Sequence, residues 1–166
     1  MLTTTELLSL LDRPYAWFET KRRRNRQAAE SRRVEGGRFE KVDPDKVDLP
    51  VKDIFGGAWA KYDFEDALNM AVTLELEERG LSFLAASRLT TNAGATEVLS
   101  HGPNDPDFYI GKVVDLEGAT RHFSGGRESV VLADDEVTLI AINVTMVLRR
   151  LRKKSLEVGL AEKLGW

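Results

Sequence analysis

The chain has 166 residues and a formal net charge of −3, with 42% hydrophobic and 31% charged residues, as is ordinary for a globular protein of one domain or two small lobes. It has no cysteine, which excludes disulfides, thiolate catalysis and cysteine-based metal centres. The longest uncharged apolar run, residues 137–148, is far shorter than the roughly 20 residues of a bilayer span, so we expect no membrane span. No basic segment precedes the first apolar residues, so we expect no secretory signal and a cytoplasmic protein.

Two helices are predicted at the start of the sequence. The first spans residues 3–11, where a threonine can cap the first turn and the leucines form an apolar face. It ends at Asp12-Arg13-Pro14, because a residue before proline avoids the helical conformation, and a second helix can begin at Pro14 itself. Aromatic residues pack the start of this helix, while the basic residues that follow project into solvent. Two helices with a short break form the outline of a helix–turn–helix.

A loop and a third helix are predicted next. Gly36-Gly37 closes the basic segment, and the prolines, aspartates and glycines that follow indicate a loop with a short strand or hairpin around residues 58–61. Asp63 can cap a helix over residues 64–79, whose apolar residues recur at helical spacing. Gly80 is then a natural C-terminal stop.

After a further helix over residues 81–90, the pattern changes from helical to β. Four β-branched or aromatic runs, separated by turn residues, occur at residues 108–110, 113–114, 129–132 and 137–142. They predict a small antiparallel meander of three or four strands. Asn143 can cap a last helix over residues 144–157, which has a narrow apolar face and many basic residues.

The most specific pattern in the sequence lies around the predicted third helix. A glycine pair is followed by a basic residue and a tyrosine, an aspartate opens the helix, and a glycine ends it before another short helix; the residues are Gly57, Lys61, Tyr62, Asp66, Leu68 and Gly80. This arrangement resembles the wing-to-helix junction of MerR-like winged helix–turn–helix regulators. The resemblance covers residues 56–90 and extends more loosely to the helices of residues 3–33.

The resemblance implies an α+β fold with two parts. Residues 1–92 would form a winged helix–turn–helix-like helical lobe, and residues 93–166 a small antiparallel β-meander closed by a C-terminal helix. The implied function is transcriptional regulation through double-stranded DNA, with residues 14–33 in the major groove and the wing on phosphate or in the minor groove. The second lobe would dimerise the protein, to match two-fold related half-sites, or sense a signal. The implied DNA contacts are Lys21, Arg22, Arg23, Arg24, Arg26, Arg32, Arg33, Lys61 and Tyr62.

The charge of the basic run is compatible with several roles. Residues 21–41 contain nine basic and three acidic residues, and such a run neutralises phosphates and reads guanine through arginine. Residues 42–139 contain eight basic and nineteen acidic residues, so the basic run could instead pair with acids of the same chain or form a solvated face. It could also bind an acidic protein partner. The protein would then be a non-enzymatic interaction or structural module, for example a phage-related accessory protein. The second basic cluster, Arg149-Arg150 with residues 152–154, fits a dimer helix, a second phosphate contact or an ordinary surface helix.

Signals for catalysis or metal binding are few. His101 and His122 lack the paired spacing of zinc ligands, and no phosphate-binding glycine motif is present. Asp105 with Asp107, or residues 134–136, could form a carboxylate pair for acid–base chemistry, but acidic clusters of this kind are typical of solvated turns. We therefore expect no enzymatic activity, no metal and no cofactor.

Overall fold

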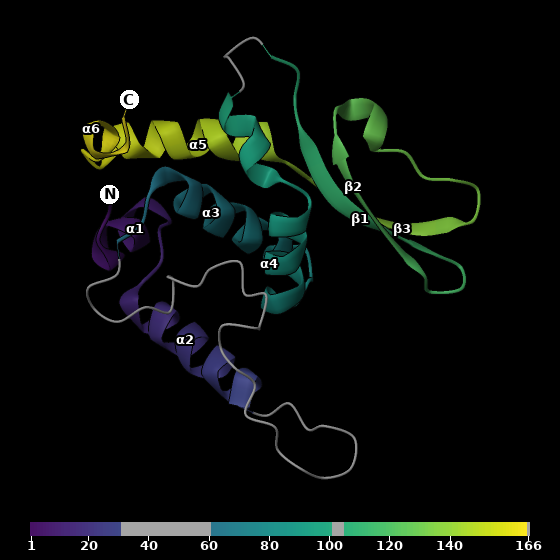
Figure 1. The fold of residues 1–166 in the computed structure, drawn as a ribbon, viewed down its shortest axis with the longest axis horizontal. Coiled ribbons are helices and arrows are strands. Elements are labelled where there is room, and N and C mark those ends of the chain that lie inside the picture. The colour runs from purple at the N-terminus through teal and green to yellow at the C-terminus, as the bar shows by residue number, and fades with distance from the viewer. Residues whose placement is uncertain (31–60, 101–104, 166) are drawn as a thin grey trace.

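The fold is mixed α+β, with N-terminal helices, a three-stranded antiparallel sheet and a C-terminal helix that packs on the sheet (Figure 1). The computed structural model describes residues 1–30, 61–100 and 105–165. In Figure 1 the helices gather on one side of the molecule, and the sheet extends away from them on the other. Within the described ranges, every helix is too short or too polar to traverse a bilayer.

The first two helices form where the sequence predicts them. Helix α1, Thr4–Leu10, starts at Thr3, whose side chain accepts a hydrogen bond from the Glu6 N–H while the Glu6 carboxylate accepts one from the Thr3 N–H. Helix α2, Tyr15–Glu30, follows Pro14, and Asp12 in the break adopts a positive φ of 51°. Local capping and the proline determine these boundaries.

The next two helices also follow their capping residues. Helix α3, Phe64–Glu78, starts at Asp63, which forms a reciprocal capping box with Asp66. The chain leaves α3 through Gly80, at a φ of 96° that favours glycine, and α4, Phe83–Asn92, is capped by Ser82. A 3₁₀ helix, η1, Ala95–Ser100, follows α4.

The sheet corrects part of the sequence prediction. Its strands are β1, Tyr109–Asp115, β2, Thr120–Gly125, and β3, Glu136–Asn143, in the order β2-β1-β3. The predicted meander, in which each strand pairs with the next along the chain, is therefore wrong, because β3 pairs with β1 instead of β2. Residues 129–132 do not form a strand; the short helix η2, Arg127–Ser129, and irregular backbone occupy this stretch.

Strand β2 lies in a stretch for which sequence analysis predicted no strand. Its Phe123 pairs with Gly111 of β1, and a Cβ on Gly111 would lie 2.5 Å from the Phe123 ring. The aromatic ring thus packs across a glycine of the neighbouring strand. Strand β2 ends at Gly125, whose φ of 142° favours glycine and allows the turn into η2.

The C-terminal part follows the prediction closely. Helix α5, Val144–Glu157, has the predicted bounds, and the Asn143 side chain accepts a hydrogen bond from the Met146 N–H at 3.0 Å. A short helix, α6, Ala161–Leu164, comes after it.

Helix α3 lies at the centre of the packing. It contacts α4, α5, η1 and β3, and its residues from Ala67 to Leu76 are buried on nearly every side. One apolar cluster contains residues from both predicted parts of the chain, including Leu68 of α3, Ile110 of β1 and Leu148 of α5. The division at residue 92 stays a prediction, and these two parts share buried contacts across it.

Candidate nucleic-acid interface on helix α2

Helix α2 is fixed to the rest of the protein at its first turns. Phe18 is only 3% exposed and belongs to the main apolar cluster, against which Trp17 also packs. The Tyr15 and Phe18 rings lie 6.1 Å apart, centroid to centroid. In Figure 1 the C-terminal end of α2 lies farther from α3 and α5 than its start does. The aromatic start thus anchors the helix, as the sequence predicts.

The structure places Lys21 of α2 against α3 and α4. Its ammonium group forms an ion pair with Glu77 of α3, and it lies 4.9 Å from the centre of the Phe83 ring and 5.9 Å from that of Trp17. The Lys21 side chain is only 14% exposed. A lysine held between a carboxylate and two aromatic faces joins α2 to α3 and α4. Lys21 thus pairs within the chain, as one of the alternatives for the basic run allows, and its contact with DNA stays a prediction.

Tyr62 is likewise an internal residue. It is 0% exposed and lies in the main apolar cluster. Its backbone forms an isolated antiparallel bridge with Leu2, with N···O distances of 2.6 and 2.9 Å. Two large side chains on paired residues are thereby buried together, so the structure places Tyr62 in the core, and its contact with DNA stays a prediction. The neighbouring Lys61 is exposed.

The remaining predicted residues fall into two groups. Arg23 lies on α2 and is exposed, as a phosphate contact requires. Arg22, Arg24 and Arg26 lie on the same helix, but their side chains are outside the described residues, as are Arg32 and Arg33 altogether. The wing residues before Lys61, including Gly57 and the predicted strand or hairpin at 58–61 up to residue 60, also lie outside them. The described helix backbone nevertheless places four consecutive basic residues, 21–24, in one turn.

The acidic end of α3 lies next to the α1–α2 break. Arg13 donates a hydrogen bond of 2.5 Å to Glu78, one residue after the Glu77 that pairs with Lys21. Glu75 pairs with Arg150 of α5 at 2.7 Å. Three acidic positions near the end of one helix thus bind cations from α2, from the turn before it and from α5. Sequence analysis left pairing within the chain open but did not identify these partners, which only the spatial neighbours of α3 reveal. The pairs of Glu77 and Glu78 couple the orientation of α2 to the core.

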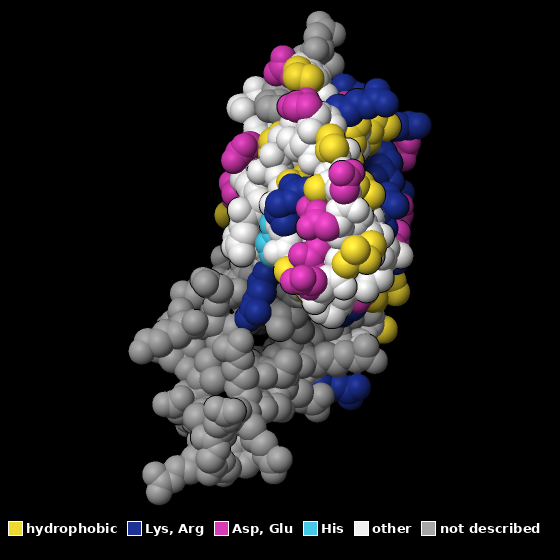
Figure 2. Space-filling model, turned by 90° about the vertical axis from the view of Figure 1, so that its right-hand side faces the viewer, with side chains coloured by type: hydrophobic (Ala, Val, Ile, Leu, Met, Phe, Trp, Pro, Cys, Tyr) yellow, Lys and Arg dark blue, Asp and Glu magenta, His cyan; other side chains and the backbone are white. Residues whose placement is uncertain are grey.

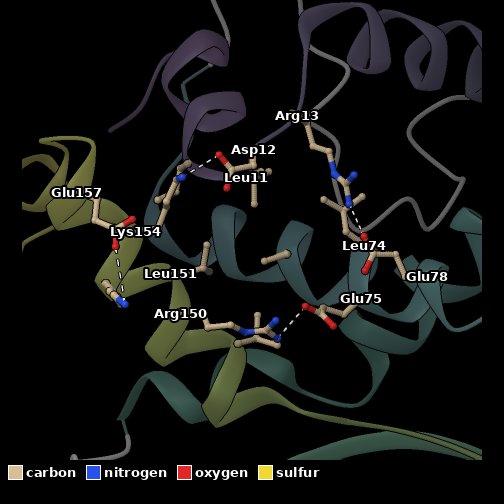
Figure 3. A pocket seen from close by; sticks show the side chains of 14 residues that line it. Leu11, Asp12, Arg13, Leu74, Glu75, Glu78, Arg150, Leu151, Lys154 and Glu157 are labelled. Atoms are coloured by element: carbon tan, nitrogen blue, oxygen red, sulfur yellow. Dashed lines mark hydrogen bonds and ion pairs between the residues drawn. The ribbon is translucent and has the colours of Figure 1, made fainter.

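A groove of about 410 Å³ opens beside these pairs, between the end of α1, α3 and α5 (Figure 3). Leu11, Leu74 and Leu151 give it an apolar floor. Ion pairs form its rim, among them Lys154 with Asp12 at 2.8 Å, and the hydrogen bond to Asp12 raises the pKa of Lys154. Because the rim cations face the rim carboxylates, the groove presents no excess charge of either sign.

The residues considered for acid–base or metal chemistry have structural partners or lie at the surface. Asp107 accepts a hydrogen bond from the Asn143 amide at 2.9 Å and faces Arg149 at 3.7 Å. Glu136 accepts hydrogen bonds from the Ala133 N–H and from Arg121, which together lower its pKa. In the described part of the chain, no three His, Asp or Glu side chains are grouped as a metal site would need. His122 is exposed, and His101 lies outside the described residues.

The second basic cluster on α5 is engaged with acids of the same chain. Arg149, Arg150 and Lys154 pair with acids on other elements, and Lys153 lies 4.0 Å from Glu157 of α5 itself. These contacts are typical of a surface helix that joins several elements. They leave the three interpretations of this cluster open.

Comparison of the chain with models of known protein families, with functionally characterised proteins and with solved structures finds no match.

Proposed function

We propose that this protein is a DNA-binding transcriptional regulator of the winged helix–turn–helix type, in which α2 enters the major groove of double-stranded DNA. The observation that carries the proposal is the placement of α2. The helix follows α1 after a break at residues 11–14, is anchored by its aromatic start, and continues as a strongly basic helix at the border of the molecule (Figure 1). An anchored first half and a basic second half suit a helix that must be held rigidly while it contacts phosphates.

The bridge between Leu2 and Tyr62 supports the resemblance to MerR-like regulators. It joins the residue before the cap of α1 to the residue just before the cap of α3, and so closes the chain at the point where a wing would return to the helical body. Tyr62 then acts as a core residue at the root of the wing, while the exposed Lys61 is the wing residue that can reach phosphate.

The proposed contact set combines these placements with the sequence prediction, which alone supplies the arginines whose side chains lie outside the described residues. Lys21 and Tyr62 orient the helix and the wing from inside the protein. Phosphate and base contacts are assigned to Arg22, Arg23, Arg24, Arg26, Arg32, Arg33 and Lys61. Each arginine that neutralises a phosphate releases a counterion, so affinity should fall steeply with salt, and an arginine in the major groove can bind guanine through two hydrogen bonds.

The test is a variant in which Arg23→Ala and Arg26→Ala are combined. If both residues contact phosphate, binding to sequences selected from a random duplex library should weaken, and the slope of log affinity against log salt should decrease by roughly two. The matched control combines Arg79→Ala and Arg127→Ala, which removes the same charge from exposed positions outside both basic helices, α2 and α5. Fluorescence anisotropy measures both quantities. Equal affinity and slope for the wild type and the α2 variant would remove α2 from the interface.

The second candidate is a non-enzymatic interaction module whose basic helix binds an acidic protein partner. One observation favours it: the base of α2 already pairs with acidic side chains, through Lys21 with Glu77 and Arg13 with Glu78. A surface that recognises carboxylates arranged along a helix would resist competition by heparin or bulk DNA better than a phosphate-binding surface. Retention of a captured partner in the presence of excess heparin would therefore favour this candidate over DNA binding.

A further inference from the structure

Strand β3 leaves one edge of the sheet open. It pairs with β1 only, so in the described part of the chain nothing pairs with its other side. The Val144 N–H donates to the Phe108 carbonyl at 2.8 Å, which sets the alternation of the ladder: even-numbered residues of β3 bond to β1. The N–H and C=O groups of Leu139 and Ala141 therefore point outward from the sheet. These groups can accept another strand.

The open edge lacks the usual protection against strand pairing. Lysine or proline on an edge strand commonly prevents it from pairing with another chain, and β3 contains neither. Its one charged residue is Glu136, whose carboxylate already accepts hydrogen bonds from Arg121 and from the Ala133 N–H. Val137 is 56% exposed, and exposed apolar side chains surround the start of the strand, at Leu116, Val131 and Leu132. Figure 2, which views the molecule from the sheet side, shows hydrophobic side chains at the surface among acidic ones.

Acidic residues lie at one end of β3, and the N-terminus of a helix lies at the other. Exposed Asp134 and Asp135 precede the strand. At its other end begins α5, whose N-terminus carries the positive end of the helix dipole and whose first turn bears exposed Met146, while Arg149 already faces Asp107 at 3.7 Å. Antiparallel pairing with an identical strand brings the start of each strand beside the end of the other. A two-fold axis would therefore place Asp134 and Asp135 of each copy near the α5 N-terminus of the other. It would also bring the exposed Val137 of each copy towards the exposed Met146 of the other.

We propose that two copies of this chain associate through the open edges of β3 and form one continuous antiparallel sheet, in the order β2-β1-β3-β3-β1-β2. A second copy is the occupant that the edge favours, because an identical antiparallel strand brings acids to a helix N-terminus and Val137 towards Met146 at both ends of the pairing. The proposal deepens the proposed function, since a two-fold dimer presents two copies of α2, but it rests on the sheet edge and does not require DNA binding.

The first experiment measures the mass of the full chain in solution, without DNA. Sedimentation velocity over a range of micromolar concentrations should give twice the chain mass of 18.6 kDa. Val137→Lys places a charge at the exposed edge and should weaken association at least tenfold, with an unchanged circular dichroism spectrum. Leu156→Lys is the matched control, because Leu156 is an exposed apolar residue, 68% accessible, near the end of α5 and away from the edge. It should leave the mass unchanged.

The second experiment locates the two-fold axis. Because the sequence has no cysteine, single cysteines introduced in turn at residues 138–141 can form a disulfide only between copies. Oxidation should link the copies at the position or positions nearest the axis, and not at Ser124→Cys on the opposite edge strand β2. A monomeric wild type at 100 micromolar overturns the proposal. So does a dimer that Val137→Lys leaves intact and that no cysteine in β3 links. A wild-type dimer that does not bind DNA would overturn the proposed function and leave the proposed dimer standing.

Discussion

Glu6 links the capping of α1 to a residue far away in the sequence. Its carboxylate accepts the Thr3 N–H at 2.9 Å and a hydrogen bond of 2.5 Å from Lys163, and the Lys163 contact is the main reason that its pKa falls to about 2. A carboxylate whose pKa is lowered by folding stabilises the folded state above its unfolded pKa, 4.5 here, and this stabilisation is lost as pH falls towards about 2.

Glu6→Gln should therefore lower the free energy of unfolding at pH 7 by about 1 kcal/mol, a value typical of a cap combined with a surface ion pair. The difference from the wild type should shrink between about pH 5 and pH 2, because the wild-type carboxylate itself becomes protonated there. Urea denaturation at several pH values measures it. Glu117→Gln, in the exposed turn between β1 and β2, serves as the control. A difference that is the same at pH 2 and pH 7 would contradict this account of Glu6.

Lys21 joins α2 to α3 and α4. The structure joins it to Glu77 and to two aromatic rings, so its removal should affect stability first. In a double-mutant cycle with Lys21→Met and Glu77→Gln, we expect a coupling energy of about 1 kcal/mol, because the pair is partly buried. Chemical denaturation of the four proteins measures it. Additive effects of the two substitutions would mean that the ion pair contributes nothing to holding α2.

At the scale of elements, the packing of β2 on β1 depends on one glycine. A Cβ at Gly111 would clash with the Ile140 carbonyl and with the Phe123 ring, which β2 places over it. Gly111→Ala should lower the free energy of unfolding by about 1–3 kcal/mol, as overpacking in a rigid sheet does. Gly126→Ala is the matched control, because its φ is −71° and its new Cβ would meet only the side chain of Glu128. Thermal unfolding compares the two; equal effects would mean that the strands separate to accept the methyl group.

At the scale of the whole molecule, α3 joins the proposed functional surfaces. One end of it holds α2 through Glu77, and its buried residues pack against β3 and α5. The open edge of β3 and the basic helix α2 thus rest on the same rigid helix. A dimer formed through β3 would therefore fix the separation of two α2 helices, which is what binding to two half-sites at a defined spacing requires.

Much of the helical structure follows from local signals. The caps Thr3, Asp63 and Asn143, together with Pro14 and Gly80, predict where the helices begin and end, because a capping side chain acts within three residues of its own position. The sheet could be predicted only as antiparallel strands. Its order depends on which strand lies beside β1, and β2 is stabilised by Phe123 packing on a residue of another strand.

The sequence by itself determined the helix boundaries, the mixed α+β class and the basic character of α2, because these depend on neighbours along the chain and on composition. Only the tertiary structure decided that Lys21 and Tyr62 face inward, that α3 carboxylates pair with α2 and α5, and that β3 has an open edge. The physical reason is the same in each case. A charged or aromatic side chain is exposed or internal according to the partners that folding brings to it from distant positions.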